Sequence, residues 1–358
     1  MQEENKNTFG NRLKLARKMA GMSLQDLADA LENKITKQAL SKYELGLMNP
    51  NGEVLLDVAK VLEVRPDYFL KKNQVELGQI SFRKRNSLSK KDEDSIVEKT
   101  RDYVERFLEI ENILVVENKF NNPLENLKIN NKKDVESAAN KLREVWELGS
   151  DPITNIIETL ELKGVKVLLI DAVDDIDGFA VFTSNGIPVV VVNTRDKPVE
   201  RIRFTIIHEL AHLLLKFSES DKLTNKEIET LCHCFSSCFL IPSKMLIKMI
   251  GGGKRTYIAI KELILIKEYY GISIRALLHR LRELDIIIPN YYQRWVIYLS
   301  KEYGSKKEPG KYKGEEKSKL LEQMVSRALS EELISLSKAA MLCNTSINEI
   351  RKRFFSAN

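Results

Sequence analysis

His208-Glu209-Leu210-Ala211-His212 lies in an apolar segment, from Ile206 to Leu215, whose pattern predicts a helix. Residues four apart share one face of a helix, so the two imidazoles can bind the same metal ion. Glu209 then lies beside the water that it must deprotonate. Chance spacing is the alternative, but the chain has only four histidines, and neither proline nor glycine interrupts the segment. The motif therefore predicts a zinc site with a general base.

A catalytic zinc site usually has three protein ligands and one open position. The third ligand does not follow the metzincin pattern, because Leu215 and Ser218 occupy the places that would need glycine and histidine. It must therefore come from a later element. The candidates are Glu219, Asp221, Glu227, Glu229 and His233.

Composition places few limits on function. With 358 residues, 43% of them hydrophobic, the chain can form two or three compact units. A net charge of +6 is too small to establish nucleic-acid binding. No segment has the length and apolarity of a membrane span, the N-terminus lacks a signal-peptide core, and four cysteines do not make an extracellular disulfide framework. We therefore expect a soluble, cytoplasmic protein.

Five short helices are predicted between Phe9 and Lys72. The segment contains Ser23-Leu24-Gln25-Asp26-Leu27-Ala28, then Thr36-Lys37-Gln38-Ala39-Leu40-Ser41-Lys42-Tyr43-Glu44-Leu45-Gly46, then a loop at Pro50. The first run has a capping box with aspartate in place of the usual glutamate, and Thr36 is the N-cap of the third helix. The segment resembles the XRE/phage-repressor helix-turn-helix domain.

The resemblance implies that the third helix enters the major groove of DNA. The side chains expected to read base edges are Lys37, Gln38, Ser41 and Lys42. Arg12 and Lys18 are candidates for phosphate contacts. Arg17 matches a structural arginine of the family and is expected to pair with Glu44. The alternative is a degenerate helical domain that only dimerises.

The middle of the chain mixes helices and strands. Helices are predicted at residues 90–116, 134–148, 152–162, 225–240 and 257–270, and the motif helix is expected to begin near Pro198 or Glu200. Strands are predicted at residues 165–170, 178–183 and 187–193, with Asn185-Gly186 as the turn between the last two.

Several of these segments share residues with one known family. They are Ser81-Phe82-Arg83, Asp177-Gly178-Phe179, Val190-Val191-Val192-Asn193, Arg201-Ile202-Arg203-Phe204-Thr205-Ile206-Ile207, Glu229, Phe235, Leu240-Ile241-Pro242 and Gly271-Ile272-Ser273. With the histidine motif, they resemble the ImmA/IrrE family of zinc-dependent peptidases and peptidase-like regulators, which is often fused to an XRE-type domain. The resemblance implies that zinc is bound by His208, His212 and Glu229, with Glu209 as the catalytic base.

The chain departs from that family after Glu229, where Cys232 and His233 replace the usual alanine and asparagine. His233 lies one turn after Glu229 on the same face, so two roles stay open: orienting a ligand, or binding the metal itself. The cysteines of this helix, Cys232, Cys234 and Cys238, are expected to be buried and inert, with a redox or second metal site as the alternative.

A charged linker is expected at residues 305–319, followed by a helical segment at residues 326–355. Within that segment, Ser335-Leu336-Ser337-Lys338-Ala339-Ala340 followed by Thr345-Ser346-Ile347 faintly resembles a second helix-turn-helix. A helical cap on the peptidase domain is the favoured interpretation.

The chain is thus predicted to be α+β and mostly helical. A five-helix helix-turn-helix domain is expected at residues 1–75 and a helical connector at 76–150. A zincin-like domain with a small sheet follows at 151–300, and a charged linker with C-terminal helices at 301–358.

Two functions fit this organisation. One is a transcriptional regulator, expected as a homodimer on a double-stranded DNA operator, whose zinc peptidase cleaves a regulatory protein such as a repressor or antitoxin. If the strand ending at Val192-Asn193 lies at a sheet edge, it can pair with the substrate. The other is a non-proteolytic, stress- or ligand-sensing transcription factor with a structural zinc site. The intact Glu209 favours catalysis, because a structural site needs no base.

Overall fold

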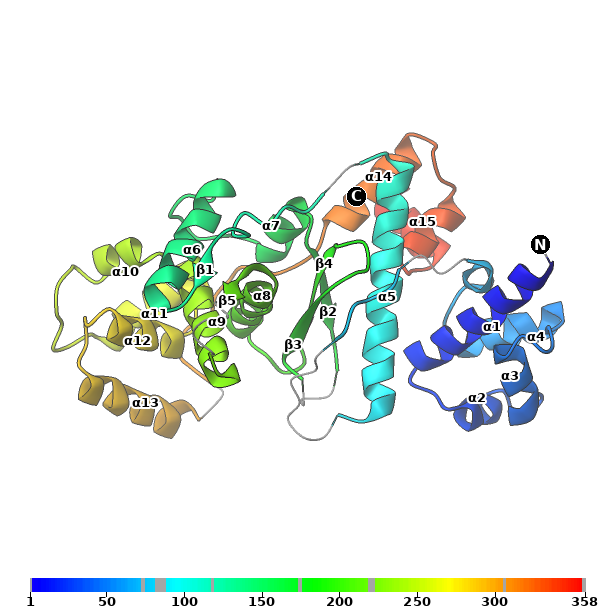
Figure 1. Ribbon diagram of the computed structural model, residues 1–358, viewed down its shortest axis with the longest axis horizontal. Helices are drawn as coiled ribbons and strands as arrows, with labels where there is room; N and C mark the ends of the chain where they lie inside the picture. The colour runs from blue at the N-terminus through cyan, green and yellow to red at the C-terminus, as the bar shows by residue number, and fades with distance from the viewer. Residues whose placement is uncertain are drawn as a thin grey trace. The chain divides into compact units, whose positions relative to one another are not determined.

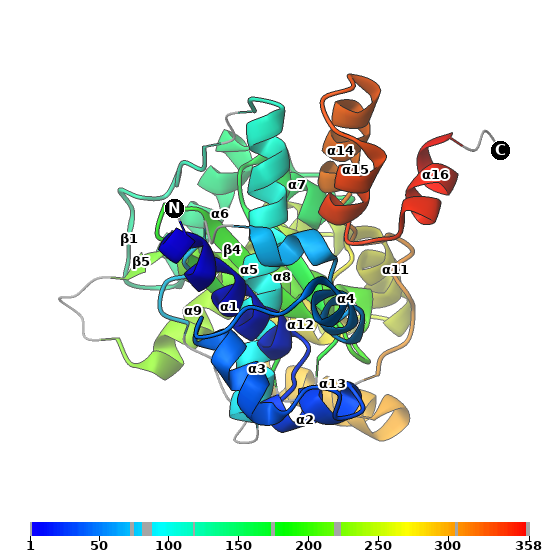
Figure 2. The ribbon, with the colours of Figure 1, turned by 90° about the vertical axis from the view of Figure 1, so that its right-hand side faces the viewer.

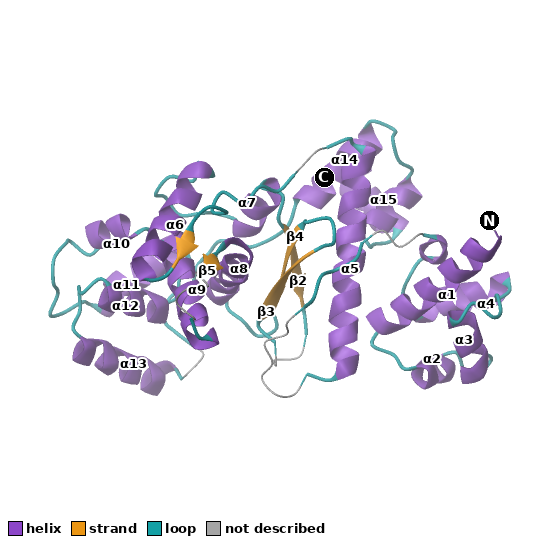
Figure 3. Ribbon diagram, in the orientation of Figure 1, coloured by secondary structure: helices purple, strands orange, loops and turns teal. Residues whose placement is uncertain are grey.

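The computed structural model describes residues 2–71, 75–80, 88–116, 119–172, 176–217, 223–304 and 307–355, except for the side chains of residues 2–8 and of residue 355. The chain divides into two compact units. The first contains Met1–Gly78, Arg83–Glu117 and Leu321–Asn358, and the second contains Gln79–Phe82 and Asn118–Leu320. Both are rich in helices, and the sheets are small, which confirms the predicted fold class (Figure 3).

The first unit begins with the five predicted helices. They are α1 (Gln2–Met19), α2 (Leu24–Ala30), α3 (Lys37–Glu44), α4 (Gly52–Val61) and the 3-10 helix η1 (Pro66–Leu70). The expected caps set the helix starts: Ser23 Oγ accepts from the Asp26 amide at 3.0 Å, and Thr36 Oγ1 accepts from the Ala39 amide at 3.2 Å. The apolar stripes meet in one core that includes the fully buried Leu13, Leu27, Leu40 and Phe69.

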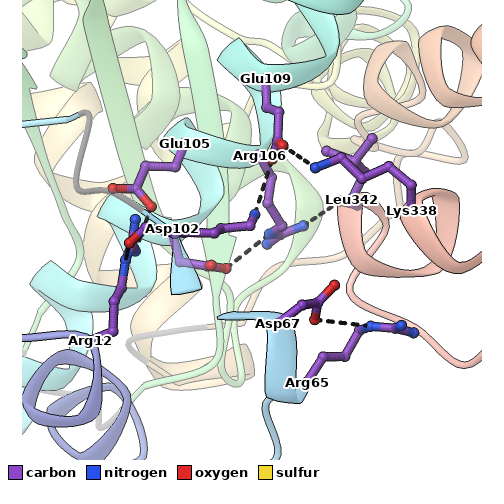
Figure 4. A network of polar contacts seen from close by, with 10 residues as sticks. Arg12, Arg65, Asp67, Asp102, Glu105, Arg106, Glu109, Lys338 and Leu342 are labelled. Atoms are coloured by element: carbon purple, nitrogen blue, oxygen red, sulfur yellow. Dashed lines mark hydrogen bonds and ion pairs between the residues drawn. The ribbon is translucent and has the colours of Figure 1, made fainter. Parts of the chain in front are cut away.

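The long helix α5 (Lys90–Ile113) packs along α1 in the same unit. Arg12 of α1 donates to Glu105 Oε2 at 2.7 Å (Figure 4). It also donates to the carbonyl of Lys71 at 2.9 Å, and its guanidinium lies over the Tyr68 ring. Near one end of α5, Ser95 Oγ donates to the carbonyl of Met19 at 2.8 Å. The helix predicted as part of a connector is therefore integral to the first unit.

The C-terminal helices α14 (Leu320–Ser330), α15 (Leu336–Leu342) and α16 (Ile347–Phe355) complete this unit. Arg106 of α5 donates to the carbonyl of Leu342 at 2.8 Å, and Lys338 pairs with Glu109 (Figure 4). The expected cap on the peptidase domain is therefore wrong, because these polar contacts join the C-terminal helices to α5.

A three-stranded sheet organises the second unit. Its strands are β2 (Lys166–Ile170), β3 (Gly178–Phe182) and β4 (Pro188–Asn193), in the order β2-β4-β3. β2 pairs with β4 in parallel, while β3 and β4 form the predicted hairpin around Gly186, which has a φ of +77°. β4 is therefore central and fully buried, not an edge strand as considered from the sequence. The edge strands of this sheet are β2 and β3.

The motif helix α8 (Val199–Leu214) packs against β3 and β4 (Figure 1). The other helices of this unit are α6 (Lys132–Val145), α7 (Ile156–Leu162), α9 (Asn225–Leu240), α10 (Ser243–Met249), α11 (Ile260–Tyr270), α12 (Ile274–Glu283) and α13 (Pro289–Tyr303). Two short strands, β1 (Lys128–Ile129) and β5 (Lys216–Phe217), pair in parallel. No single helix of the described chain is long and apolar enough to cross a membrane, and only the bent α9–α10 pair reaches that length and composition jointly.

Residues 307–319, expected from the sequence to be a charged linker, are docked on the second unit and form a strap. Glu316 accepts hydrogen bonds from the amides of Ile156 and Ile157 at the start of α7, and it pairs with the fully buried Arg203 of α8. Glu308 does the same at the start of α12, where the Ile274 amide donates to it at 2.7 Å. A carboxylate at a helix N-terminus accepts hydrogen bonds from the free amides and interacts favourably with the helix dipole. Because Glu316 also pairs with Arg203, the strap holds α8, the helix that contains the histidine motif.

Candidate metal centre and DNA-reading surface

Helices α8 and α9 bring together three of the predicted donors. His208 Nε2 lies 3.2 Å from Glu229 Oε2 and 3.3 Å from His212 Nε2, and His212 Nε2 lies 3.7 Å from Glu229 Oε1. Four ligands at zinc–nitrogen distances of 2.0–2.1 Å in a tetrahedron would lie about 3.3 Å from one another. The spacing of these donors therefore fits one zinc ion.

His233 is a fourth potential donor. Its ring centre lies 4.5 Å from that of His208 and 5.8 Å from that of Phe204. Donor atoms of His208, Glu229 and His233 all lie within 4.8 Å of one another. His233 is exposed, yet partial desolvation of its ring, together with neighbouring His208, lowers its pKa to about 4. His233 is therefore a neutral imidazole, the form that binds metals.

Of the other carboxylates proposed as third ligands, only Glu227 lies in the described part of the chain, and it does not join this cluster. Glu227 lies in the first turn of α9, where the Thr224 amide donates to it at 2.8 Å in a capping box. Glu219 and Asp221 lie outside the described residues, as does Ser81-Phe82-Arg83. Among the described candidates, only Glu229 and His233 reach the histidines of α8.

The side chain of Glu209, a residue of α8, lies beside Gly178 at the start of β3. A Cβ atom at Gly178 would come within 2.6 Å of the Val191 carbonyl oxygen and 3.3 Å of Glu209 Cγ, so only glycine fits between β4 and Glu209 at this point. The preceding Asp177 pairs with Lys197 at 3.0 Å and Arg201 at 2.9 Å. Burial raises the pKa of Asp177, but these cations lower it more, so the pKa falls below its usual value.

Cys232 contacts the candidate metal centre from the side. Its Sγ lies 3.4 Å from His212 Nδ1, the ring nitrogen that faces away from the other donors. An outer partner on that nitrogen fixes the orientation of a metal-binding histidine. The sequence signal for this contact is the Glu229-to-Cys232 spacing, which places both residues on one face of α9.

The other two cysteines of α9 contact each other. Cys234 Sγ and Cys238 Sγ are buried and lie 3.8 Å apart. The hydrogen bond to Cys234 and burial raise the pKa of Cys238, which therefore stays a thiol. Burial of all three thiols matches the expectation from the sequence.

Helix α3 presents the predicted DNA-reading side chains. Lys37, Gln38 and Lys42 are exposed, and Ser41 is half-buried. Behind this surface, Arg17 donates two hydrogen bonds to Glu44, at 2.6 and 2.9 Å. This bidentate pair joins α1 to α3 and confirms the structural role predicted for Arg17.

The two predicted phosphate contacts fare differently. Arg12 is 1% exposed and is bound to Glu105, so the prediction that it contacts phosphates is wrong. The sequence pattern could not anticipate a partner 93 residues away on α5. Lys18 is partly exposed and pairs with Asp94 at 3.0 Å, so a phosphate contact would compete with this ion pair.

Arg12→Ala is expected to destabilise the first unit by about 3 kcal/mol, because it leaves the buried Glu105 carboxylate without its cation. Chemical denaturation, followed by circular dichroism, would measure the loss. The matched control is Arg65→Ala, whose partner Asp67 is exposed, with an expected loss of about 0–1 kcal/mol. Equal losses in the two variants would contradict the structural role of Arg12.

Comparisons with known proteins match both parts of the chain. Residues 13–69 match the helix-turn-helix family model, and residues 160–282 match the model of the IrrE N-terminal-like domain. Two Bacillus subtilis proteins each align over 63 residues, or 18% of this chain. The uncharacterized HTH-type transcriptional regulator YqaE is 38% identical there, and the SPbeta prophage-derived uncharacterized HTH-type transcriptional regulator YonR is 41% identical. The chain spans about half the length of these relatives, 53% and 56%.

Proposed function

We propose that this chain, an HTH-type transcriptional regulator fused to an IrrE-like domain, binds an operator and also cleaves a regulatory protein such as a repressor or antitoxin. The observation that supports cleavage is the convergence of His208, His212 and Glu229 at zinc-like spacing next to Glu209. A purely structural metal site would have no use for the buried carboxylate of Glu209.

In this proposal each residue has one task. His208, His212 and Glu229 hold zinc, which when bound acts as a Lewis acid that polarises a peptide carbonyl and acidifies water. The Glu209 carboxylate takes the proton from the attacking water and gives it to the leaving amine. Only 5% of Glu209 is exposed, so the proton moves within a sheltered site.

The edge strand β3 is our candidate for the substrate-binding strand. In the order β2-β4-β3 this strand lies at an edge of the sheet, and edge strands are where extended peptides add to a sheet. Since β3 begins at Gly178, beside Glu209, a peptide paired along β3 would carry its scissile bond past the base. This role replaces the one considered for β4.

One observation favours the competing function, a sensor with a structural zinc. If His233 binds the metal together with the other three donors, the site has four protein ligands and no open position. Such a site would hold zinc without cleaving peptides.

The two functions are distinguished by whether the protein cleaves the peptides of a library. Zinc-loaded full-length chain would be incubated with a proteome-derived library and with proteins encoded beside this chain, and the products identified by mass spectrometry. Cleavage that a chelator stops and added zinc restores supports the peptidase. No cleavage of any substrate by a fully zinc-loaded chain supports the structural-zinc sensor.

The DNA-binding half rests on the exposed face of α3. Gln38→Ala is expected to relax base preference at one operator position, at a cost of about 1–3 kcal/mol, because glutamine can bind adenine through two hydrogen bonds. Sequence selection with the full-length variant would measure this change. Gln293→Ala, an exposed residue of α13, is the control and should keep the preference. Loss of binding to all sequences alike would mean that Gln38 does not read a base.

An operator with two inverted half-sites is expected if the protein binds as a dimer.

A further inference from the structure

The last three helices contain a helix-turn-helix that lies outside the matched family regions. Helix α15 ends at Leu342, residues 343–346 form the turn, and α16 begins at Ile347 (Figure 2). A turn of this length is typical of DNA-binding helix-turn-helix motifs. The faint sequence resemblance at Ser335 thus corresponds to a folded motif.

The first helix of each motif, α2 in one and α15 in the other, ends with the same pattern of backbone hydrogen bonds. After α2, the Glu32 amide donates to the Asp29 carbonyl and the Asn33 amide to the Ala28 carbonyl, both at 2.9 Å. The corresponding bonds after α15 are Asn344 to Met341 at 3.1 Å and Thr345 to Ala340 at 2.9 Å. Glu32 and Asn344 both have positive φ, at 56° and 49°. Both first helices therefore end in a left-handed cap of the same type.

The second helices also begin alike. Thr36 Oγ1 caps α3 by accepting from the amide three residues later, and Ser346 Oγ does the same for α16, accepting from the Glu349 amide at 3.1 Å. Counted from these caps, Asn348 corresponds to Gln38, Arg351 to Ser41 and Lys352 to Lys42. Three of the four positions expected to read bases in α3 are therefore polar or basic in α16, and the fourth, Lys37, corresponds to the apolar Ile347.

The burial pattern of α16 separates a packed face from an open face. Ile350 is fully buried, and Ile347 and Phe354 are partly buried on the same side. Asn348, Arg351 and Lys352 are exposed. Arg353 is engaged with Glu322 and Glu349, whereas Arg351 and Lys352 have no ion-pair partner in the described part of the chain. The open face therefore offers two cations and an amide.

We propose that α16 is a second DNA-binding helix, which contacts phosphates through Arg351 and Lys352 and a base edge through Asn348. Asparagine, like glutamine, can bind adenine through two hydrogen bonds, and exposed arginine and lysine neutralise phosphates. Helix α15 is held from behind by Lys338, bound to Glu109 of α5. The motif is therefore attached to the long helix of the first unit. The role is additional to that of α3 and independent of the peptidase.

The test measures binding of the full-length protein to a duplex of random sequence over a series of salt concentrations. Arg351→Ala/Lys352→Ala is expected to weaken binding roughly ten-fold and to reduce the slope of log K against log salt by about 1.8, because each phosphate contact contributes about 0.9. The matched control, Lys244→Ala/Lys248→Ala, removes two exposed lysines from α10 and should leave the slope unchanged.

A third double variant separates the two helices. Lys37→Ala/Lys42→Ala removes basic residues from α3 and tests the first motif alone. If it reduces the slope while Arg351→Ala/Lys352→Ala behaves like the α10 control, the proposal for α16 is overturned and that for α3 stands. All variants change exposed side chains, and unchanged thermal unfolding would verify their folds. Asn348→Ala should also remove a base preference in sequence selection.

Discussion

Glu209→Gln is expected to lower the rate of peptide cleavage about 10²–10⁴-fold while the zinc content of the chain stays the same. Glutamine has nearly the same shape as glutamate but cannot accept the proton of the attacking water. The Glu209 side chain is buried beside Gly178, so the isosteric replacement should also keep the local packing. Zinc would be measured by mass spectrometry of the metal, and cleavage with the peptide library.

The matched control is Glu227→Gln, in the first turn of α9. Glu227 binds Thr224 and does not reach the metal donors, so its variant should retain both zinc and cleavage. If the Glu209→Gln variant cleaves peptides at the full rate, Glu209 is not the general base, whatever the zinc content of the variant.

Replacement of the ligands is expected to produce the second large effect. His212→Ala and Glu229→Ala should each weaken zinc binding by more than about 100-fold, because both remove a donor from the cluster. Cys232→Ala should weaken it less, by about 10–100-fold, because Cys232 only contacts the outer nitrogen of His212. Competition with a chromophoric chelator would give each affinity.

His233→Ala decides between the two remaining interpretations of that residue. A loss of affinity smaller than that of Glu229→Ala fits an orienting role beside His208. A loss larger than that of Glu229→Ala would mean that His233 replaces Glu229 as the third ligand. In that case the change from the family asparagine has altered the ligand set.

Local sequence signals predicted much of this structure. The capping residues Ser23 and Thr36 locate the starts of α2 and α3, since a cap depends on only three or four neighbouring residues. The i,i+4 spacing of His208 and His212 predicted that they would share a face, and their ring nitrogens lie 3.3 Å apart. Arg17 and Glu44 were paired through a family resemblance, and the pairing is confirmed.

Features that depend on distant partners were not predicted. Arg12 has a long, basic side chain of the kind usually exposed to solvent. Nothing near it in the sequence indicates that it is buried in an ion pair with Glu105. Glu316 lies in a segment expected to be a charged linker, yet it pairs with Arg203, 113 residues away. The position of β4 at the centre of the sheet depends on two pairings, one parallel and one antiparallel, that no single strand encodes. Local patterns specify elements, whereas ion pairs and strand order require the assembled fold.

Cys232 falls between these cases. Its spacing from Glu229 predicts a shared helix face, but its contact with His212 depends on how α9 packs against α8. Helix packing angles vary with the side chains at the contact, so a sequence pattern alone does not fix such a distance.

X-ray absorption at the zinc edge of the full-length protein tests whether His208, His212 and Glu229 bind one zinc ion and leave a position open. We expect about one zinc per chain, with nitrogen and oxygen ligands at about 2.0–2.2 Å and scattering from two imidazoles. A sulfur shell at about 2.3 Å would make Cys232 a ligand, and scattering from three imidazoles would make His233 one. Either result would rule out this three-ligand site.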